Sequence, residues 1–241
     1  MSLAGKVVII TGASSGIGRA IGLCLAEEKA TVCLLGRRLD ALQAVAAAAR
    51  GAARRLEVFP IDLTVDREVL NLARNLGERF GRIDVLVHSA GVFGMGGLES
   101  APAGALDEQY RVNLRAPLVL TQALLPLLKQ ARGQIVFINS TAGLQARAQV
   151  GYYAATKHAL KALSESLRQE VNAAGVRVTT LFLGRTATPM QEAIFRAEGK
   201  SYAGEKLLQP EDVAGLLRTV LQLPETAEVT EVHMRPAIKS Y

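Results

Sequence analysis

Tyr153 and Lys157 have the residue types and the spacing that acid–base chemistry requires. They stand four positions apart at the start of a stretch with helical periodicity, 152–172, so both should lie on one helical face. A nearby ammonium group favours tyrosinate, and we therefore expect Lys157 to lower the pKa of Tyr153 from about 10. Such a tyrosine is a usable acid or base near neutral pH. Alone, the pair is more typical of a solvent-exposed helix, so its meaning depends on the motifs around it.

Ser140 is the second candidate catalytic residue. It ends a predicted buried strand that begins at 134, and it therefore lies at the carboxyl edge of the predicted sheet. Ligands bind at this edge in parallel sheets. The hydroxyl of Ser140 is suited to a hydrogen bond with a carbonyl oxygen.

A glycine-rich turn, Thr11-Gly12-Ala13-Ser14-Ser15-Gly16-Ile17-Gly18, follows a predicted strand and opens a predicted helix. Gly12 permits the tight turn, Gly16 removes a side chain where a pyrophosphate approaches, and Gly18 lets helix and strand pack closely. The helix N-terminus offers free N–H groups to the phosphates. In this context the turn predicts a dinucleotide site rather than a plain Gly-rich connection.

The residues after the second predicted strand indicate which dinucleotide binds. Gly36 supplies no carboxylate for a ribose 2′-hydroxyl, whereas Arg37, with Arg38, supplies charged donors for a 2′-phosphate. We therefore predict NADP(H) in preference to NAD(H). The alternative is an arginine pair exposed to solvent at a helix start.

Strand-like and helix-like stretches alternate through the chain, and their order predicts the elements that must position these residues. The predicted strands are 7–10, 31–35, 56–61, 83–87, 134–138, 176–183 and 229–234. The predicted helices are 16–29, 39–50, 66–80, 102–130, 152–172 and 212–221, with Pro117 and Pro126 starting, bending or breaking the long one. Repeated β–α units with apolar strands predict an α/β fold, a single Rossmann-like domain over 1–241 with a doubly wound parallel sheet and helices on both faces. The stretch 184–209 is irregular and is the candidate substrate loop or lid, with its mobility left open.

Composition excludes several classes of protein. The chain has 241 residues, of which 49% are hydrophobic and 21% charged, as in an ordinary globular protein. The net charge is +6, but the basic residues are scattered and aromatic residues make up only 5%, so a nucleic-acid partner is not expected. No apolar run reaches the length of a membrane span, and no metal-ligand spacing is present. The start shows no signal-peptide pattern, so we expect a cytoplasmic protein.

Taken together, these motifs resemble the short-chain dehydrogenase/reductase family over essentially the whole chain. The matching pieces are the glycine turn 11–18, Asp62-Leu63-Thr64, Ser89-Ala90-Gly91, Asn113, Ser140 and Tyr153-Ala154-Ala155-Thr156-Lys157. Their order and spacing are those of the family.

The resemblance implies catalytic roles for four residues. Tyr153 would protonate the carbonyl oxygen as hydride arrives, or deprotonate the alcohol in the reverse reaction, and Ser140 would orient and polarise that oxygen. Lys157 would hold the nicotinamide ribose and lower the pKa of Tyr153. Asn113 would hold a water that links Lys157 to solvent. The implied enzyme is an NADP(H)-dependent oxidoreductase acting on a carbonyl or secondary alcohol.

Cofactor contacts follow from the same resemblance. Asp62 would contact the adenine, Leu63 the cofactor through its backbone, and Thr188 the nicotinamide carboxamide. The full predicted cofactor-binding set is Gly12, Ser14, Ser15, Gly16, Ile17, Gly18, Arg37, Arg38, Asp62, Leu63, Ser89, Ala90, Gly91, Tyr153, Lys157, Thr186 and Thr188.

Two stretches depart from the family pattern. His88-Ser89 replaces the common Asn-Asn, which leaves Ser89 a shorter contact to a ribose, and we expect His88 to be a packed strand-end residue. Leu183-Gly184 replaces the common Pro-Gly, although Thr186 and Thr188 remain suitably placed for the nicotinamide.

The substrate is left open. Met190, Ile194, Phe195 and Tyr202 either cover a hydrophobic substrate or pack against the body, and Arg147, Arg185 and Arg196 are weak candidates for an acidic one. Alternatives to the general reductase are a 3-oxoacyl-thioester reductase and a non-catalytic NADP(H)-binding regulator. The resemblance also implies a homodimer or homotetramer, assembled through the helices at 102–130 and 152–172.

Overall fold

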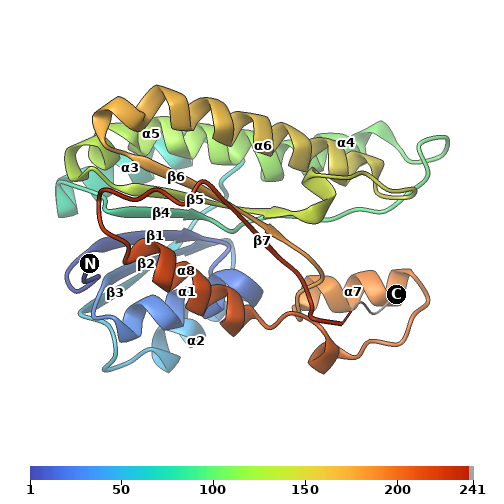
Figure 1. Ribbon diagram of the computed structural model, residues 1–241, viewed down its shortest axis with the longest axis horizontal. Coiled ribbons are helices and arrows are strands. Elements are labelled where there is room, and N and C mark those ends of the chain that lie inside the picture. The colour runs from blue at the N-terminus through green and yellow to red at the C-terminus, as the bar shows by residue number, and fades with distance from the viewer. Residues whose placement is uncertain (239–241) are drawn as a thin grey trace.

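The computed structural model describes residues 1–238, which form one domain around a parallel sheet (Figure 1). Within these residues the sheet has seven strands in the order β3-β2-β1-β4-β5-β6-β7. The strands are β1 Val7–Thr11, β2 Thr31–Gly36, β3 Arg55–Pro60, β4 Val85–His88, β5 Gln134–Ser140, β6 Arg177–Leu183 and β7 Glu231–Met234. The predicted doubly wound α/β fold is confirmed.

Helices cover both faces of the sheet. They are α1 Gly16–Glu27, α2 Leu39–Ala48, α3 Asp66–Phe80, α4 Ala103–Tyr110, α5 Ala116–Ala131, α6 Gly151–Val171, α7 Pro189–Ala197 and α8 Pro210–Leu221. In Figure 1, α1, α2 and α8 lie on one side of the sheet and α3, α5 and α6 on the other. The short helix α7 stands apart, beside the end of β7.

Alternate residues of the central strands supply two separate cores. Val8 and Ile10 of β1 pack with α1 and α8, whereas Ile9 between them packs with α3 and α5. All three are fully buried. A strand buried on both faces explains why these segments are nearly continuous apolar runs.

The predicted helix 102–130 is interrupted. α4 and α5 are separated by a π-helical turn, Arg111–Arg115, in which Asn113 is buried. Pro117 directly follows this π-helical turn in the first turn of α5, and Pro126 lies within α5 without ending it.

The segment 184–209 is more regular than the sequence analysis predicted. It contains α7, capped by the Thr188 side chain, which accepts a hydrogen bond from the Gln191 N–H at 3.2 Å. The ends of the segment are tied together, because the N–H of Ala187 donates to Leu208 and the N–H of Leu208 donates to Arg185. Thr188 followed by Pro189 is a helix-start signal that the sequence already carried.

The order of the strands reverses between β1 and β4, which are paired. Loops that follow these strands diverge to opposite sides of the sheet, and ligands bind in the crevice that results. The glycine turn follows β1 and the Ser89-Ala90-Gly91 loop follows β4, so both border this crevice. Across residues 1–238, no helix has both the length and the apolar character needed to cross a membrane.

Candidate active site

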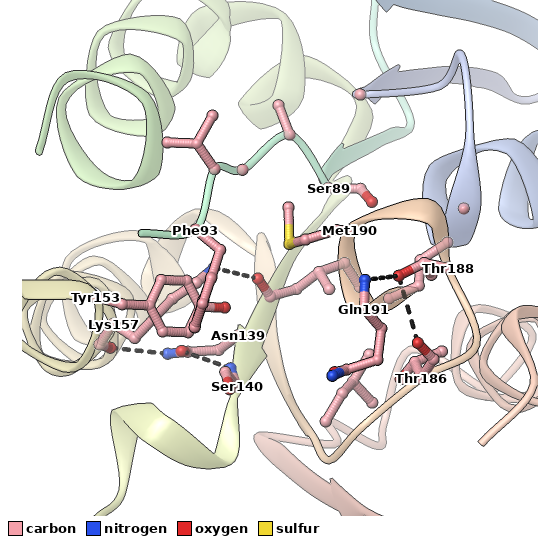
Figure 2. A pocket seen from close by; sticks show the side chains of 18 of the residues that line it. Ser89, Phe93, Asn139, Ser140, Tyr153, Lys157, Thr186, Thr188, Met190 and Gln191 are labelled. Carbon is pink, nitrogen blue, oxygen red and sulfur yellow. Dashed lines mark hydrogen bonds between the residues drawn. The ribbon is translucent and has the colours of Figure 1, made fainter. Parts of the chain in front are cut away.

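One cavity of about 1120 Å³ lies at the carboxyl ends of the strands (Figure 2). Every predicted catalytic and cofactor-binding residue borders it except Asn113, which is buried and bonded to Val92 of the cavity lining. The glycine turn and Arg37 border it together with Ser140, Tyr153 and Lys157. Motifs more than 100 residues apart in the sequence therefore meet at one site.

The glycine turn needs its glycines for space and for backbone conformation. Gly12 has φ +65°, and a Cβ there would lie 2.8 Å from the backbone of Ala90. A Cβ at Gly18 would lie 2.5 Å from the carbonyl oxygen of Gly12. Within the described chain, the Ser15 side chain caps no N–H of α1, and the first turn of that helix carries no acidic residue. The first N–H groups of α1 are thus left for an anion.

Thr11 joins the two loops of the crevice, a role that the sequence analysis missed. Its buried hydroxyl oxygen accepts hydrogen bonds from the N–H groups of Ser89 and Ala90, each at 3.0 Å. The same hydroxyl is 3.4 Å from the carbonyl oxygen of Val87. A threonine that ends a strand before a glycine turn is a weak signal, because its partner loop lies far along the chain.

Arg37 and Arg38 are exposed at the far end of the cavity from Tyr153, next to Asp62. The hydroxyl and N–H of Thr64 donate to Asp62 Oδ1 at 2.7 and 2.9 Å, and these bonds lower the pKa of Asp62. The charge of Arg37 lowers it further. A Cβ at Gly36 would meet Ser14 Oγ at 3.7 Å, so Ser14 also lies at this end of the site.

Tyr153 is half-buried in the wall of the cavity, and Phe93 lies edge-on to its ring with the centroids 4.8 Å apart. Burial raises the pKa of Tyr153 to about 12, and the neighbouring Ser140 hydroxyl opposes this rise. The expected lowering of this pKa by Lys157 is wrong. Burial penalises the tyrosinate more than the neighbouring groups stabilise it.

Lys157 is buried and lies one helical turn after Tyr153 on α6. Its ammonium donates a hydrogen bond to the carbonyl oxygen of Ile138 at 3.1 Å and lies 5.8 Å from the centre of the Tyr153 ring. Burial lowers the pKa of Lys157 to about 8. The ammonium is thus held beside the tyrosine ring by the backbone of β5.

Ser140 is positioned by Asn139, a second residue that the sequence analysis missed. The Asn139 side chain accepts from the Ser140 N–H at 2.7 Å and donates to the Lys157 carbonyl oxygen at 3.0 Å (Figure 2). This amide connects the end of β5 to α6. A Cβ at Gly143 would lie 2.7 Å from Asn139 Oδ1, so the glycine leaves room for the amide.

Asn113 fastens the loop that follows β4. Its side chain accepts from the Val92 N–H at 2.8 Å and donates to the Val92 carbonyl oxygen at 2.9 Å. It also donates to the Thr156 hydroxyl at 3.2 Å, which connects this loop to α6. The predicted water beside Asn113 stays a prediction.

His88 is a packed residue, as predicted. Its ring stacks on Phe137 at 4.9 Å between centroids, and its Nε2 is 2.8 Å from the Thr121 hydroxyl. Burial lowers the pKa of His88 to about 3, so the ring is neutral at physiological pH.

Thr186 and Thr188 lie where the β6–α7 loop crosses the glycine turn. The Thr188 hydroxyl donates to the Thr186 carbonyl oxygen at 3.3 Å, and a Cβ at Gly16 would meet the Thr188 methyl group at 3.1 Å (Figure 2). The start of α7 therefore covers the turn that opens α1.

The apolar residues of α7 divide between two tasks. Met190 and Ile194 border the cavity, whereas Phe195 is buried and packs edge-on against Tyr202 at 5.6 Å. Of the three arginines considered for an acidic substrate, Arg147 and Arg185 border the cavity. Arg196 lies outside the residues that border it and is 79% exposed.

Comparison with known proteins agrees with this geometry. The family model described as short chain dehydrogenase matches residues 6–199. An uncharacterised oxidoreductase of Staphylococcus epidermidis is 33% identical over 96% of this chain and 97% of its own length. An alcohol dehydrogenase from Thermococcus sibiricus, solved with 5-hydroxy-NADP, is 28% identical with a TM-score of 0.89, covering 98% of both chains. A metagenomic short-chain oxidoreductase solved with NADP is 31% identical with a TM-score of 0.84, covering 99% of this chain and 100% of its own.

Proposed function

This chain belongs to the short-chain dehydrogenase family and is an oxidoreductase of that type, and from this premise we propose that it interconverts a carbonyl compound and an alcohol with NADP(H). The observation that carries the proposal is the convergence of Ser140, Tyr153 and Lys157 on the cavity that the glycine turn also borders. A redox cofactor site and a proton donor then share one space.

The residues at the cofactor end fit a phosphorylated dinucleotide. A Cβ at Gly12 or Gly18 would strike backbone, so the turn is built for close approach, and the N-terminus of α1 favours an anion. Exposed Arg37 and Arg38 are matched to a 2′-phosphate. Asp62, Leu63, Ser89, Ala90 and Gly91 border the same end and would hold the adenosine half. Two of the similar solved structures contain NADP or a derivative of it.

Proton transfer is assigned to Tyr153. With a pKa raised to about 12 in the cofactor-free protein, its hydroxyl is protonated at neutral pH and is ready to donate to a carbonyl oxygen. The Ser140 hydroxyl would orient that oxygen by a second hydrogen bond. When bound, the nicotinamide supplies the hydride for reduction or accepts it in oxidation.

Lys157 would act on Tyr153 and on the cofactor ribose. Its ammonium is fixed beside the Tyr153 ring by the Ile138 carbonyl oxygen, so its positive charge stabilises the negative charge that grows on the phenol oxygen. Asn113 keeps the loop at Val92 against α6, and we propose that a water beside it returns protons from solvent. Thr186 and Thr188 would hold the nicotinamide end.

The test is a set of aldehydes and ketones incubated with the protein and either NADPH or NADH, with cofactor oxidation followed by absorbance. We expect turnover of at least one carbonyl, faster with NADPH. Tight NADPH binding without turnover of any carbonyl, including 3-oxoacyl thioesters, would contradict the proposal and favour a cofactor-binding regulator.

Assembly and location belong to the same proposal. We propose a homodimer or homotetramer formed through the long helices, supported by the exposed apolar side chains of Tyr110 in α4 and Leu118 in α5. A cytoplasmic location stays a prediction of the sequence. Light scattering after gel filtration at micromolar concentration tests the assembly, and a monomer there would contradict it.

A further inference from the structure

Arg185 brings an incompletely used guanidinium group to the substrate end of the cavity. It follows Leu183 by two residues, and Leu183 is the register partner of Ser140 in the neighbouring strand. Arg185 therefore lies at the same sheet edge as the predicted catalytic serine. Its Nη2 donates to both carboxylate oxygens of Glu198, at 2.7 and 2.8 Å.

The second terminal nitrogen of this guanidinium, Nη1, has no hydrogen-bond partner within residues 1–238. This nitrogen is buried, although Arg185 borders the cavity. The guanidinium is held in place by Glu198 and by the Phe195 ring, whose centre is 4.6 Å from its central carbon. A buried donor without an acceptor costs free energy, and a ligand that supplies the acceptor removes that cost.

Gln191 presents a second unused donor. Its side chain is about nine-tenths buried, and its Nε2 likewise has no hydrogen-bond partner in the part of the chain that the structure describes. Figure 2 shows this side chain extending from the first turn of α7 toward the part of the pocket that Ser140 and Thr186 also border. The terminal torsion of a glutamine is soft, so a small rotation turns the amide toward a ligand.

The charge balance at this end of the cavity is positive. Lys200 also pairs with Glu198, at 3.0 Å, so two cations share one carboxylate. Arg147 and Arg235 border the cavity as well. The remaining substrate-side wall carries the apolar residues Phe93, Leu144, Val150, Met190 and Ile194 beside the polar Thr141 and Gln145. A ligand with one anionic group on a short apolar body matches this lining.

We propose that Arg185 and Gln191 form a subsite for a carboxylate group, so that the substrate is a hydroxy acid or the corresponding oxo acid. Both donor atoms are enclosed by protein in this structure, so the carboxylate oxygens accept from Arg185 Nη1 and Gln191 Nε2 after the two side chains turn toward the cavity. The proposal rests on the proposed function, because it names the substrate class of that same site. It adds a specificity-determining pair to the residues that carry out the reaction.

The test compares acids with their methyl esters, which lack the negative charge and carry one additional methyl group. The probes are 2-hydroxybutanoate, 3-hydroxybutanoate and 4-hydroxypentanoate, each with its ester. Binding to the NADP+-saturated protein is measured by calorimetry, and oxidation is measured by NADPH formation. For the best acid we expect binding about tenfold or more tighter than for its ester, because a charge-assisted hydrogen bond is lost in the ester.

The decisive variant is Arg185→Met, which keeps an apolar side chain next to Phe195 but removes the N–H donors of the guanidinium. We expect the ratio of acid to ester affinity to fall about tenfold. Gln191→Leu should lower the same ratio by a smaller factor, and it serves as the test if Arg185→Met does not fold. Arg196→Met is the matched control, because it removes the same charge from an exposed position on α7 outside the cavity.

The two proposals fail in different ways. Equal binding of acid and ester by the wild-type protein, or an unchanged ratio in Arg185→Met, would overturn the carboxylate subsite. Arg185 would then serve only to fasten α7 through Glu198. A clear acid preference in calorimetry without any NADPH formation would leave the subsite standing and contradict the proposed function.

Discussion

The Lys157 ammonium group lies 5.8 Å from the centre of the Tyr153 ring and donates a hydrogen bond to the Ile138 carbonyl oxygen. Lys157 is buried, and Tyr153 is half-buried in the cavity wall. Burial raises the pKa of Tyr153 to about 12 and lowers that of Lys157 to about 8. Each group is thus held closer to its neutral form than it is in water, and the consequences are measurable.

Lys157→Met should stabilise the cofactor-free protein near pH 7. The folded pKa of about 8 lies below the ordinary value of 10.5, so the folded state keeps this proton at a cost. The cost of holding this charge in the folded state is full below pH 8. Between pH 8 and 10.5 the unfolded chain binds more protons than the folded one, so the cost is relieved as pH rises through this interval. We expect the free energy of unfolding to rise by about 1–3 kcal/mol at pH 7, after the lost bond to Ile138 is offset.

Urea denaturation of both proteins at pH 7 and pH 10 measures this effect. The advantage of Lys157→Met should shrink at pH 10. The control is Lys161→Met, which removes a lysine from the same helix. The Lys161 side chain is 30% exposed and pairs with Glu165. A Lys157→Met protein less stable than the wild type at pH 7 would show that the buried charge carries no net cost.

The two directions of the reaction should respond oppositely to pH. Reduction uses the protonated Tyr153, which predominates below its raised pKa, whereas oxidation uses the tyrosinate, whose fraction increases about tenfold per pH unit below that pKa. We expect kcat/KM for reduction to stay level from pH 6 to 7 and to fall as Lys157 loses its proton near pH 8, whereas kcat/KM for oxidation rises from pH 6 to 7. A parallel rise in both directions would argue against Tyr153 as the proton donor.

Arg37→Ala should discriminate between the two nicotinamide cofactors. Arg37 is exposed and borders the cavity beside Asp62, where a 2′-phosphate would be met by its guanidinium. We expect about tenfold to hundredfold weaker NADPH binding and little change for NADH, because a charge-assisted phosphate contact is lost. Fluorescence titration provides the measurement, with exposed Arg67→Ala on α3 as the control. Equal losses for both cofactors would exclude Arg37 as the 2′-phosphate ligand.

Thr11→Val should loosen the crevice without changing its shape. The variant leaves the N–H groups of Ser89 and Ala90 without the acceptor that they have at 3.0 Å. We expect a loss of about 1–3 kcal/mol in the free energy of unfolding and weaker NADPH binding. Thr11→Ser, which retains the hydroxyl, should restore most of both. If Thr11→Val unfolds like the wild type, water satisfies these groups and the link is dispensable.

Local pattern was sufficient to predict most of the fold. Helix α3 was predicted over 66–80 and has these bounds, because it is amphipathic and ends at Gly81, whose φ is +70°. The strands were predicted from apolar runs because both faces of this sheet are covered. The motifs around Gly12, Ser140 and Tyr153 meet because parallel strands bring their carboxyl ends to one edge.

What the sequence could not provide depends on contacts between distant segments. Thr11 and Asn139 acquire their roles from partners 78 and 18 residues away. The pKa of Tyr153 moves opposite to the prediction because its sign depends on how deeply α6 buries the ring, which the spacing to Lys157 does not report. The unpaired donors of Arg185 and Gln191 depend on how α7 packs, which the sequence does not report.

The central claim is that Tyr153 transfers the proton of an NADP(H)-dependent reaction. Tyr153→Phe removes one oxygen from a half-buried ring that Phe93 continues to contact. The decisive measurement is turnover of the best carbonyl by this variant, beside its NADPH affinity measured by fluorescence. We predict that turnover falls by about 10²-fold or more while NADPH affinity stays within about threefold. Turnover near the wild-type rate would contradict the account.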